Sequence, residues 1–256
     1  MIAEASLSGV APAAVPRYAP REPERAMYVL HYAPDNASLI VRLALEELGL
    51  AYRCMLVDRA RRAQDSAAYR RLNPAGLIPA LETPQGPMSE TGAILLWLSE
   101  THGALAPAPR SAERRRFLTW LFFTANTLHA DARLLFYPER HAGRGADMVA
   151  FSAATEARIA RHVALLEDVA AERPDWLSPE APSVLGYYVV TLMRWLALYP
   201  ADRAGWFDLA ARPALHSLAA ALENRPAARR AAEAEGLGAT IFTKPSSACP
   251  PEGSAT

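Results

Sequence analysis

Two short stretches in the first half of the chain carry groups that could bind a peptide-like ligand. The first is Ile78-Pro79, where a proline at the start of a predicted strand removes a main-chain donor from the sheet. A cis bond before Pro79 would turn the chain sharply and leave the main chain of Ile78 open to solvent. An open strand edge of this kind can pair with the main chain of a peptide.

The second stretch is Glu90-Thr91, at a predicted junction between a strand and a helix. Free amides and the positive dipole end make a helix N-terminus a site for an anion. The Thr91 hydroxyl can donate to a carboxylate, and the Glu90 carboxylate can accept from an ammonium group. Together these groups suit the zwitterionic end of a peptide, but a plain strand end at Pro79 and a plain helix cap explain the residues equally well.

Other side chains of catalytic type are few. His129 lies on a long predicted helix and Tyr32 ends the first predicted strand, and residues at such places pack more often than they react. The sequence has no CxxC, no Cys/His cluster at zinc-ligand spacing and no glycine-rich phosphate motif. Its two cysteines, Cys54 and Cys249, are too few for a disulfide framework. We therefore expect no metal site.

The charges of the chain are balanced, with 27 Lys and Arg residues against 27 Asp and Glu residues. A neutral chain has no global field to attract nucleic acid or an anionic membrane. No apolar window is long enough to span a bilayer. Residues 1–25 are rich in Ala and Pro and lack the basic and apolar regions of a signal peptide. We expect them to form a disordered tail, and we expect neither a nucleic acid nor a membrane as partner.

Hydrophobic patterning predicts a mixed α/β domain over residues 26–103. Strands are expected at 27–33, 51–57, 77–83 and 87–90, and helices at 38–48, 66–72 and 91–102. The first two strands must be parallel because a helix separates them, and the last two form a hairpin.

The rest of the chain has no strand pattern. Residues 104–110 form a proline-bearing linker, and residues 111–242 are predicted to form an all-helical domain. Its helices are expected at 111–137, 146–172, 183–199, 212–223 and 226–235. Residues 243–256 are expected to be a loose tail.

Several segments together resemble the glutathione transferase family. NPAGLIPAL and SETGAILLWL are similar to its N-terminal domain, and ERRRFLTWLFFTANTLH to the start of its helical domain. The resemblance covers residues from about 27 to about 242. It implies an α/β thioredoxin-like N-terminal domain followed by an all-α helical-bundle C-terminal domain. It also implies that Ile78, next to Pro79, binds the cysteinyl main chain of glutathione, and that Glu90 and Thr91 bind its γ-glutamyl end.

The group that stabilises the glutathione thiolate is not obvious, because Ala37 stands where the bacterial beta class of the family has a cysteine. The hydroxyl of Ser38 and the amide of Asn36 could donate to sulfur, or could simply cap the helix. The resemblance places Tyr32 at or next to the catalytic tyrosine of some classes. It also places His129 where a histidine lines the substrate pocket of beta-class relatives. We rank Ser38 first, Asn36 second and Tyr32 third.

These observations predict a cytosolic, homodimeric glutathione S-transferase that presents the thiolate of reduced glutathione to a small electrophile. A non-catalytic glutathione-binding or regulatory protein is one alternative, and a glutathione-dependent reductase or β-etherase is another. The rate with a generic aryl halide, compared with the affinity for glutathione, separates a transferase from a binding protein.

Overall fold

The computed structural model describes residues 28–201 and 205–255, so the predicted N-terminal tail lies outside the described residues. The first domain contains a four-stranded sheet in the order β2-β1-β3-β4. Its strands are β1 (Tyr28–Tyr32), β2 (Tyr52–Leu56), β3 (Ala80–Thr83) and β4 (Gly86–Ser89). β1 and β2 are parallel, and β3 is antiparallel to both β1 and β4. The predicted parallel pair and hairpin are therefore confirmed.

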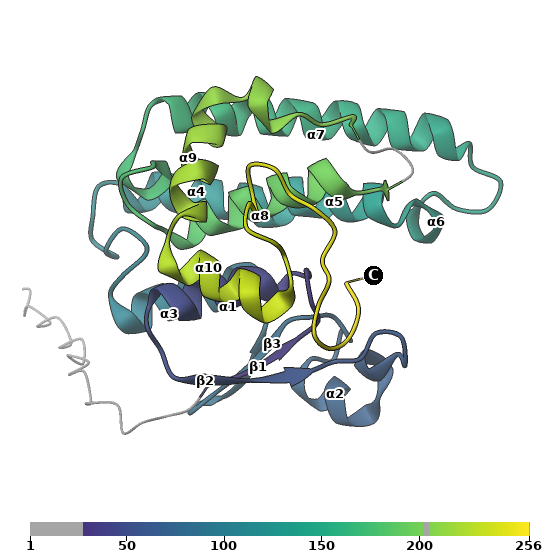
Figure 1. The fold of residues 1–256 in the computed structure, drawn as a ribbon, viewed down its shortest axis with the longest axis horizontal. Coiled ribbons are helices and arrows are strands. Elements are labelled where there is room, and N and C mark those ends of the chain that lie inside the picture. The colour runs from purple at the N-terminus through teal and green to yellow at the C-terminus, as the bar shows by residue number, and fades with distance from the viewer. Residues whose placement is uncertain (1–27, 202–204, 256) are drawn as a thin grey trace, which may run out of the picture.

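Helices cover both faces of this sheet (Figure 1). α1 (Ser38–Glu47) and α3 (Thr91–His102) lie between the sheet and the helical domain, whereas α2 (Ala67–Leu72) lies on the other face. The central strand β1 is buried, and α1 is buried along most of its length because it packs on the sheet below and on α8 and α10 above. This is the thioredoxin-like domain that the sequence predicts.

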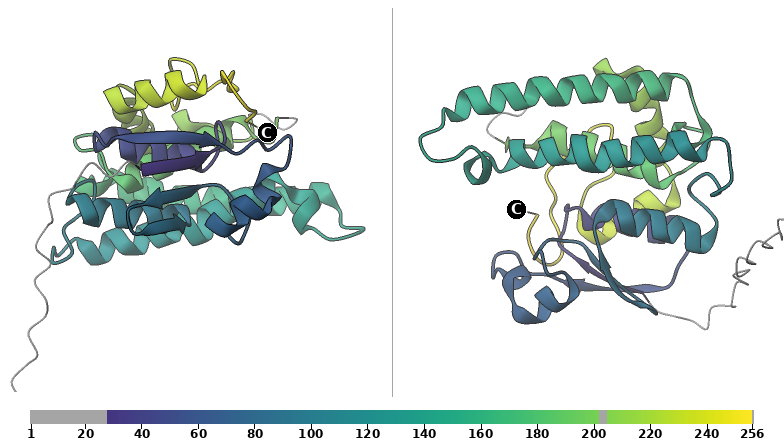
Figure 2. Two further views of the ribbon diagram at one scale, coloured as in Figure 1. Left: turned by 90° about the horizontal axis from the view of Figure 1, so that it is seen from below. Right: turned by 180° about the vertical axis from the view of Figure 1, so that it is seen from behind.

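The second half of the described chain is helical, as predicted. Its α-helices are α4 (Arg114–Phe123), α5 (His129–Phe136), α6 (Pro138–His141), α7 (Met148–Ala171), α8 (Val184–Leu198), α9 (Pro213–Glu223) and α10 (Pro226–Glu235). A single π-helical turn (Thr124–Leu128) joins α4 to α5, so the predicted helix at 111–137 forms one rod with an irregular centre. This rod and α7 run side by side in Figure 1 and in the right view of Figure 2.

α8 is the centre of the helical domain. Ser183 caps its first turn by accepting from the amide of Gly186 at 2.8 Å. Its side chains are buried over nearly the whole length, including the charged side chain of Arg194. A charge in such a place must be paired, and its partner, Asp35, comes from the loop after β1. The two domains are therefore joined by an ion pair as well as by apolar contacts.

The C-terminal segment corrects one expectation. Residues 243–255 do not hang loose but run back over the first domain, as the yellow trace in Figure 1 shows. The amide of Cys249 donates to the carbonyl of Gly236, and the carbonyl of Ser246 accepts from buried Arg194. Glu252 accepts from Tyr32 at 2.5 Å, and the carbonyl of Ala255 accepts from Arg59 at 2.8 Å. The composition of this segment predicted a loose tail. Its bonding partners are distant in the sequence, so composition could not reveal them.

Candidate active site

A cavity of about 1120 Å³ lies between the two domains. The first domain contributes the loop after β1, the segment that leads into β3 and the start of α3, and the helical domain contributes α5 and the end of α8. Six of the eight residues predicted to form the site line this cavity: Asn36, Ile78, Pro79, Glu90, Thr91 and His129. Ser38 and Tyr32 do not.

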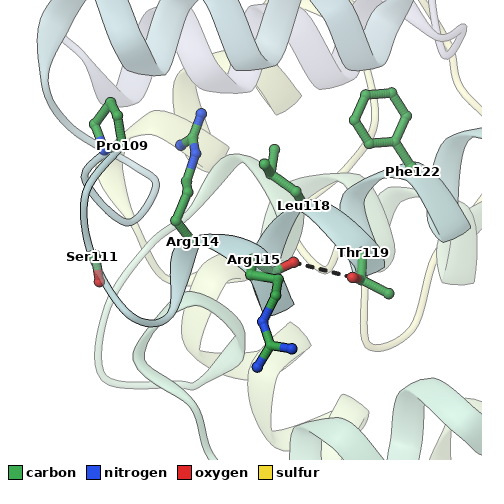
Figure 3. Close-up of a pocket in the computed structure, with 7 residues that line it drawn as sticks. All are labelled: Pro109, Ser111, Arg114, Arg115, Leu118, Thr119 and Phe122. Atoms are coloured by element: carbon green, nitrogen blue, oxygen red, sulfur yellow. Dashed lines mark hydrogen bonds between the residues drawn. The ribbon is translucent and has the colours of Figure 1, made fainter. Parts of the chain in front are cut away.

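A smaller hollow of about 570 Å³ lies on α4 and the segment before it (Figure 3). Its lining includes Arg115, Thr119 and the exposed ring of Phe122, and the Thr119 hydroxyl donates to the carbonyl of Arg115. None of the residues singled out from the sequence lies there. The interdomain cavity is therefore the candidate site.

The Ile78-Pro79 bond is cis, as predicted. Ile78 precedes β3, and neither its N–H nor its C=O bonds to another residue in the described part of the chain. The carbonyl of Leu77 is held by two side chains, the Tyr69 hydroxyl at 2.8 Å and the Asn73 amide at 2.6 Å. These two bonds fix the segment so that the Ile78 main chain is available to a ligand in the cavity.

The N-terminus of α3 borders the same cavity. Glu90 precedes the helix with a φ of 69° and is exposed, whereas Thr91 is buried against the cavity wall. The first turn of α3 offers main-chain N–H groups and the positive end of the helix dipole. Burial, and then the negative charge of Glu90, raise the pKa of the Tyr188 hydroxyl, which lines the same cavity. The arrangement can hold an anion at Thr91 and a cation at Glu90.

The three candidate sulfur ligands lie in different places. The Ser38 hydroxyl is fully buried, donates to the carbonyl of Ala33 at 3.0 Å and accepts from its amide. The Tyr32 hydroxyl is buried and donates to Glu252. Only Asn36 reaches the cavity, and because its Oδ1 accepts from the amide of Ala37 at 2.8 Å, its Nδ2 is the group left to donate. We therefore place Asn36 ahead of Ser38 and Tyr32.

Two buried ion pairs hold the loop that carries Asn36. The Asp35 carboxylate accepts from Arg194 at 2.9 and 2.8 Å and from the Trp195 ring nitrogen at 2.8 Å. The Asp35 amide donates to Glu235 at 2.8 Å, and Glu235 also accepts from Arg42 at 2.7 Å. Burial raises the pKa of Glu235 to about 7. The Asp35 carboxylate thus points toward α8 of the helical domain.

Neither Arg194 nor Glu235 was predicted from the sequence as a partner of this loop. The sequence did contain a signal for Arg194, because it is the single charged residue within the apolar helix VLGYYVVTLMRWLAL. A charge in such a helix indicates a buried, paired side chain. The sequence contained no such signal for Glu235, because it is one of several charged residues on an Ala-rich helix.

His129 lies at the α5 side of the cavity. Its Nδ1 is 2.8 Å from the Tyr188 hydroxyl, and its ring lies 5.8 Å from that of Trp195. Burial, with a smaller contribution from Arg133, lowers the pKa of His129 to about 4. The imidazole is therefore neutral at pH 7 and is suited to hydrogen bonding rather than to charge stabilisation.

Gln64 also lines the cavity and was not predicted. Its Oε1 is buried and has no hydrogen-bond partner in the described part of the chain. A buried acceptor without a partner is costly, so this oxygen is available to a ligand N–H group. The main-chain oxygen of Gln64 lies beside Gly76, and both residues line the cavity with Ile78.

Other kinds of site receive no support from the described residues. Neither free cysteine lines the cavity, and burial raises the pKa of the Cys54 thiol. No group of three metal-binding side chains is found in residues 28–201 or 205–255. Within the same residues, no helix is both long enough and apolar enough to cross a membrane.

Comparison with known proteins identifies the family of this chain. The family model "Glutathione S-transferase, N-terminal domain" matches residues 30–109, which include Ile78, Glu90 and Thr91. A sphingomonad glutathione S-transferase crystallised with glutathione is 32% identical, with a TM-score of 0.66 over 82% of this chain and 100% of its own. This chain belongs to the glutathione S-transferase family.

Two other relatives show how far the likeness extends. Glutathione S-transferase GstA of Escherichia coli O157:H7 is 25% identical over 213 residues, which are 81% of this chain and 98% of that protein. Disulfide-bond oxidoreductase YfcG of Escherichia coli K12 is 36% identical over 109 residues, 40% of this chain and 50% of that protein. Members of the family thus differ in reaction, and the family alone does not select one.

Proposed function

We propose that this protein is a glutathione S-transferase that binds reduced glutathione in the interdomain cavity and delivers its sulfur to an electrophile. The proposal rests mainly on one observation: the open main chain of Ile78 and the N-terminus of α3 at Thr91 border the same cavity. Such a pair matches a ligand with a peptide bond at one place and a zwitterionic group at another.

The proposed orientation of glutathione follows from these groups. Its γ-glutamyl carboxylate accepts from Thr91 and the first-turn amides of α3, and its ammonium group donates to Glu90. The cysteinyl N–H and C=O pair with the main chain of Ile78. The glycyl end then extends along the cavity lining that contains Gln64, whose buried Oε1 can accept from a ligand N–H. The cysteinyl sulfur faces Asn36 at the start of α1.

The reaction needs a thiolate, because a free thiol has a pKa near 8.5 and is mostly protonated at pH 7. Donation from Asn36 Nδ2 and the positive end of α1 stabilise the negative sulfur and lower its pKa. The thiol proton leaves to solvent. The sulfur electron pair forms the bond to carbon, and the leaving group departs with its own pair. The protein contributes orientation and electrostatic stabilisation, because the nucleophile belongs to glutathione.

An alternative function is a glutathione-dependent disulfide reductase, which the match to the Escherichia coli oxidoreductase favours. In that reaction glutathione supplies both electrons, and the protein needs no cysteine in the cavity. The two reactions are separated by parallel assays with 1-chloro-2,4-dinitrobenzene and with 2-hydroxyethyl disulfide. Faster disulfide reduction would replace the transferase assignment, and tight glutathione binding without either reaction would make the protein a binding module.

The direct test of the transferase is calorimetry with reduced glutathione followed by the aryl halide assay. We expect micromolar to millimolar binding and a measurable conjugation rate in the wild type. Absence of glutathione binding would refute the proposal. We also propose that the enzyme is a cytosolic homodimer, and sedimentation as a monomer at micromolar concentration would contradict the dimer.

A further inference from the structure

The cavity continues beyond the residues assigned to glutathione. The α3 N-terminus lies beside the start of this extension, because a Cβ added at Gly92 would come 3.4 Å from the Cβ of Ala125. Arg133 lies eight residues further along the rod formed by α4 and α5, or about 12 Å at the rise of a helix. We call this far end the acceptor end, and it is lined by Arg133, Phe136, Tyr137, Arg140, Tyr199 and Pro200.

Aromatic rings form much of the acceptor end. The rings of Phe136 and Tyr199 meet edge to face at 5.9 Å, and Arg140 lies over the ring of Tyr137 at 4.6 Å. Tyr137 itself accepts from Arg59 at 2.9 Å, which fixes the ring against the first domain. Such walls favour a ligand with a flat, apolar body.

Positive charge is the other property of this end. The guanidinium of Arg133 is exposed to the cavity and has no hydrogen-bond or ion-pair partner in the described residues. Arg59 and Arg140 add two more positive charges to the lining. Asp35, which lines the same cavity, is already neutralised by Arg194 and Trp195. Arg140 also pairs with Glu139 at 3.6 Å, so the unpaired charge here is that of Arg133. No carboxylate is found among the described residues that line the acceptor end.

We propose that the acceptor end selects electrophiles that carry a carboxylate on an aromatic or conjugated body, with the carboxylate bound by Arg133. The inference rests on the proposed function, since it assumes that glutathione occupies the other end of the cavity. Arginine suits the task because its planar donors match the two oxygens of a carboxylate. The glycyl carboxylate of glutathione is the competing anion, and the test must distinguish the two.

Two stable conjugates measure the preference without any chemical step. S-(4-carboxybenzyl)glutathione and its analogue with a methyl ester on the benzyl carboxylate share the same glutathione part. They differ at the acceptor end in charge and by one methyl group. Calorimetry with the wild type, Arg133→Gln and the matched control Arg229→Gln gives three affinity ratios. Arg229 is exposed on α10 and does not line the cavity, and its replacement by Gln removes the same charge as Arg133→Gln.

In the wild type and in Arg229→Gln we expect the carboxylate conjugate to bind about tenfold more tightly than the ester. In Arg133→Gln we expect this ratio to fall close to one, with the affinity for glutathione itself unchanged. A ratio near one in the wild type, or an unchanged ratio in Arg133→Gln, overturns the inference while the proposed function stands. A weaker affinity for glutathione in Arg133→Gln, equal for both conjugates, assigns Arg133 to the glycyl carboxylate and also overturns it. Failure of both conjugates and of glutathione to bind overturns the proposed function as well.

Discussion

The buried ion pair between Asp35 and Arg194 should be the most sensitive contact between the two domains. Both side chains are 0% exposed, and two hydrogen bonds of 2.9 and 2.8 Å join them. The substitution Asp35→Asn keeps the shape of the side chain but removes its charge. One of its donors would then face the guanidinium of Arg194, which stays charged and buried. Removing one partner of such a pair typically costs about 3–5 kcal/mol.

Two features of the structure decide where the cost falls in this range. Arg194 keeps two carbonyl partners, Ile241 at 3.1 Å and Ser246 at 2.9 Å, which soften the loss. The ring nitrogen of Trp195 donates to Oδ1 of Asp35, and the amide oxygen of Asn can still accept from it, so this bond adds little to the loss. We therefore expect the free energy of unfolding to fall by about 4 kcal/mol. Affinity for glutathione should fall too, because Asn36 sits on the released loop.

Urea denaturation followed by circular dichroism measures the loss. At a slope of about 3 kcal/mol per molar urea, the midpoint should fall by about 1–2 M. The matched control is Glu172→Gln, which removes an exposed ion pair with Arg116 and should cost under about 1 kcal/mol. The double variant Asp35→Asn/Arg194→Met should recover part of the loss, because it leaves no unpaired charge. A loss below about 1 kcal/mol in Asp35→Asn would refute the reasoning.

Three further predictions concern single residues of the site. Thr91→Ala should weaken glutathione binding by about 1–2 kcal/mol in calorimetry, the value of a hydrogen bond to a charged group, and unchanged affinity would remove Thr91 from the site. Asn36→Ala should raise the pKa of the bound glutathione thiol, measured from thiolate absorbance, whereas Ser38→Ala should not; the opposite result would restore Ser38 as the donor. Glu235 has its pKa raised to about 7, so its protonated form stabilises the fold below its ordinary pKa of 4.5 and this contribution is lost as pH rises through 7. The stability difference between the wild type and Glu235→Gln should therefore decrease by about 3 kcal/mol from pH 4.5 to 7 in urea titrations, and a difference that does not change with pH would show that Glu235 is charged throughout.

The order of the elements could be predicted from the sequence because each depends on local patterning. The glycine at 49 ends the first helix, and the helix between the first two strands requires their parallel pairing. The C-terminal segment could not be predicted in this way. Residues 243–255 contain few apolar side chains, and their main-chain bonds to Arg194, Gly236 and Arg59 join parts of the chain that no local pattern connects.

The site was predicted best where a backbone feature determines it. Pro79 requires an interruption at the start of β3, and Thr91 lies at a helix start, so both could be placed without tertiary information. The hydrogen-bond donors of the loop after β1 were harder to predict, because Asn36 and Ser38 are close in sequence but point in different directions. Ser38 turns inward to bond Ala33, and only Asn36 faces the cavity. Their roles toward sulfur stay predictions until they are measured.

A crystal structure with reduced glutathione would test the central claim most directly. The account predicts the γ-glutamyl carboxylate at Thr91 and the first turn of α3, the cysteinyl main chain paired with Ile78, and the sulfur within hydrogen-bonding distance of Asn36. Glutathione bound elsewhere, or bound in the cavity with its cysteinyl main chain away from Ile78, would contradict it.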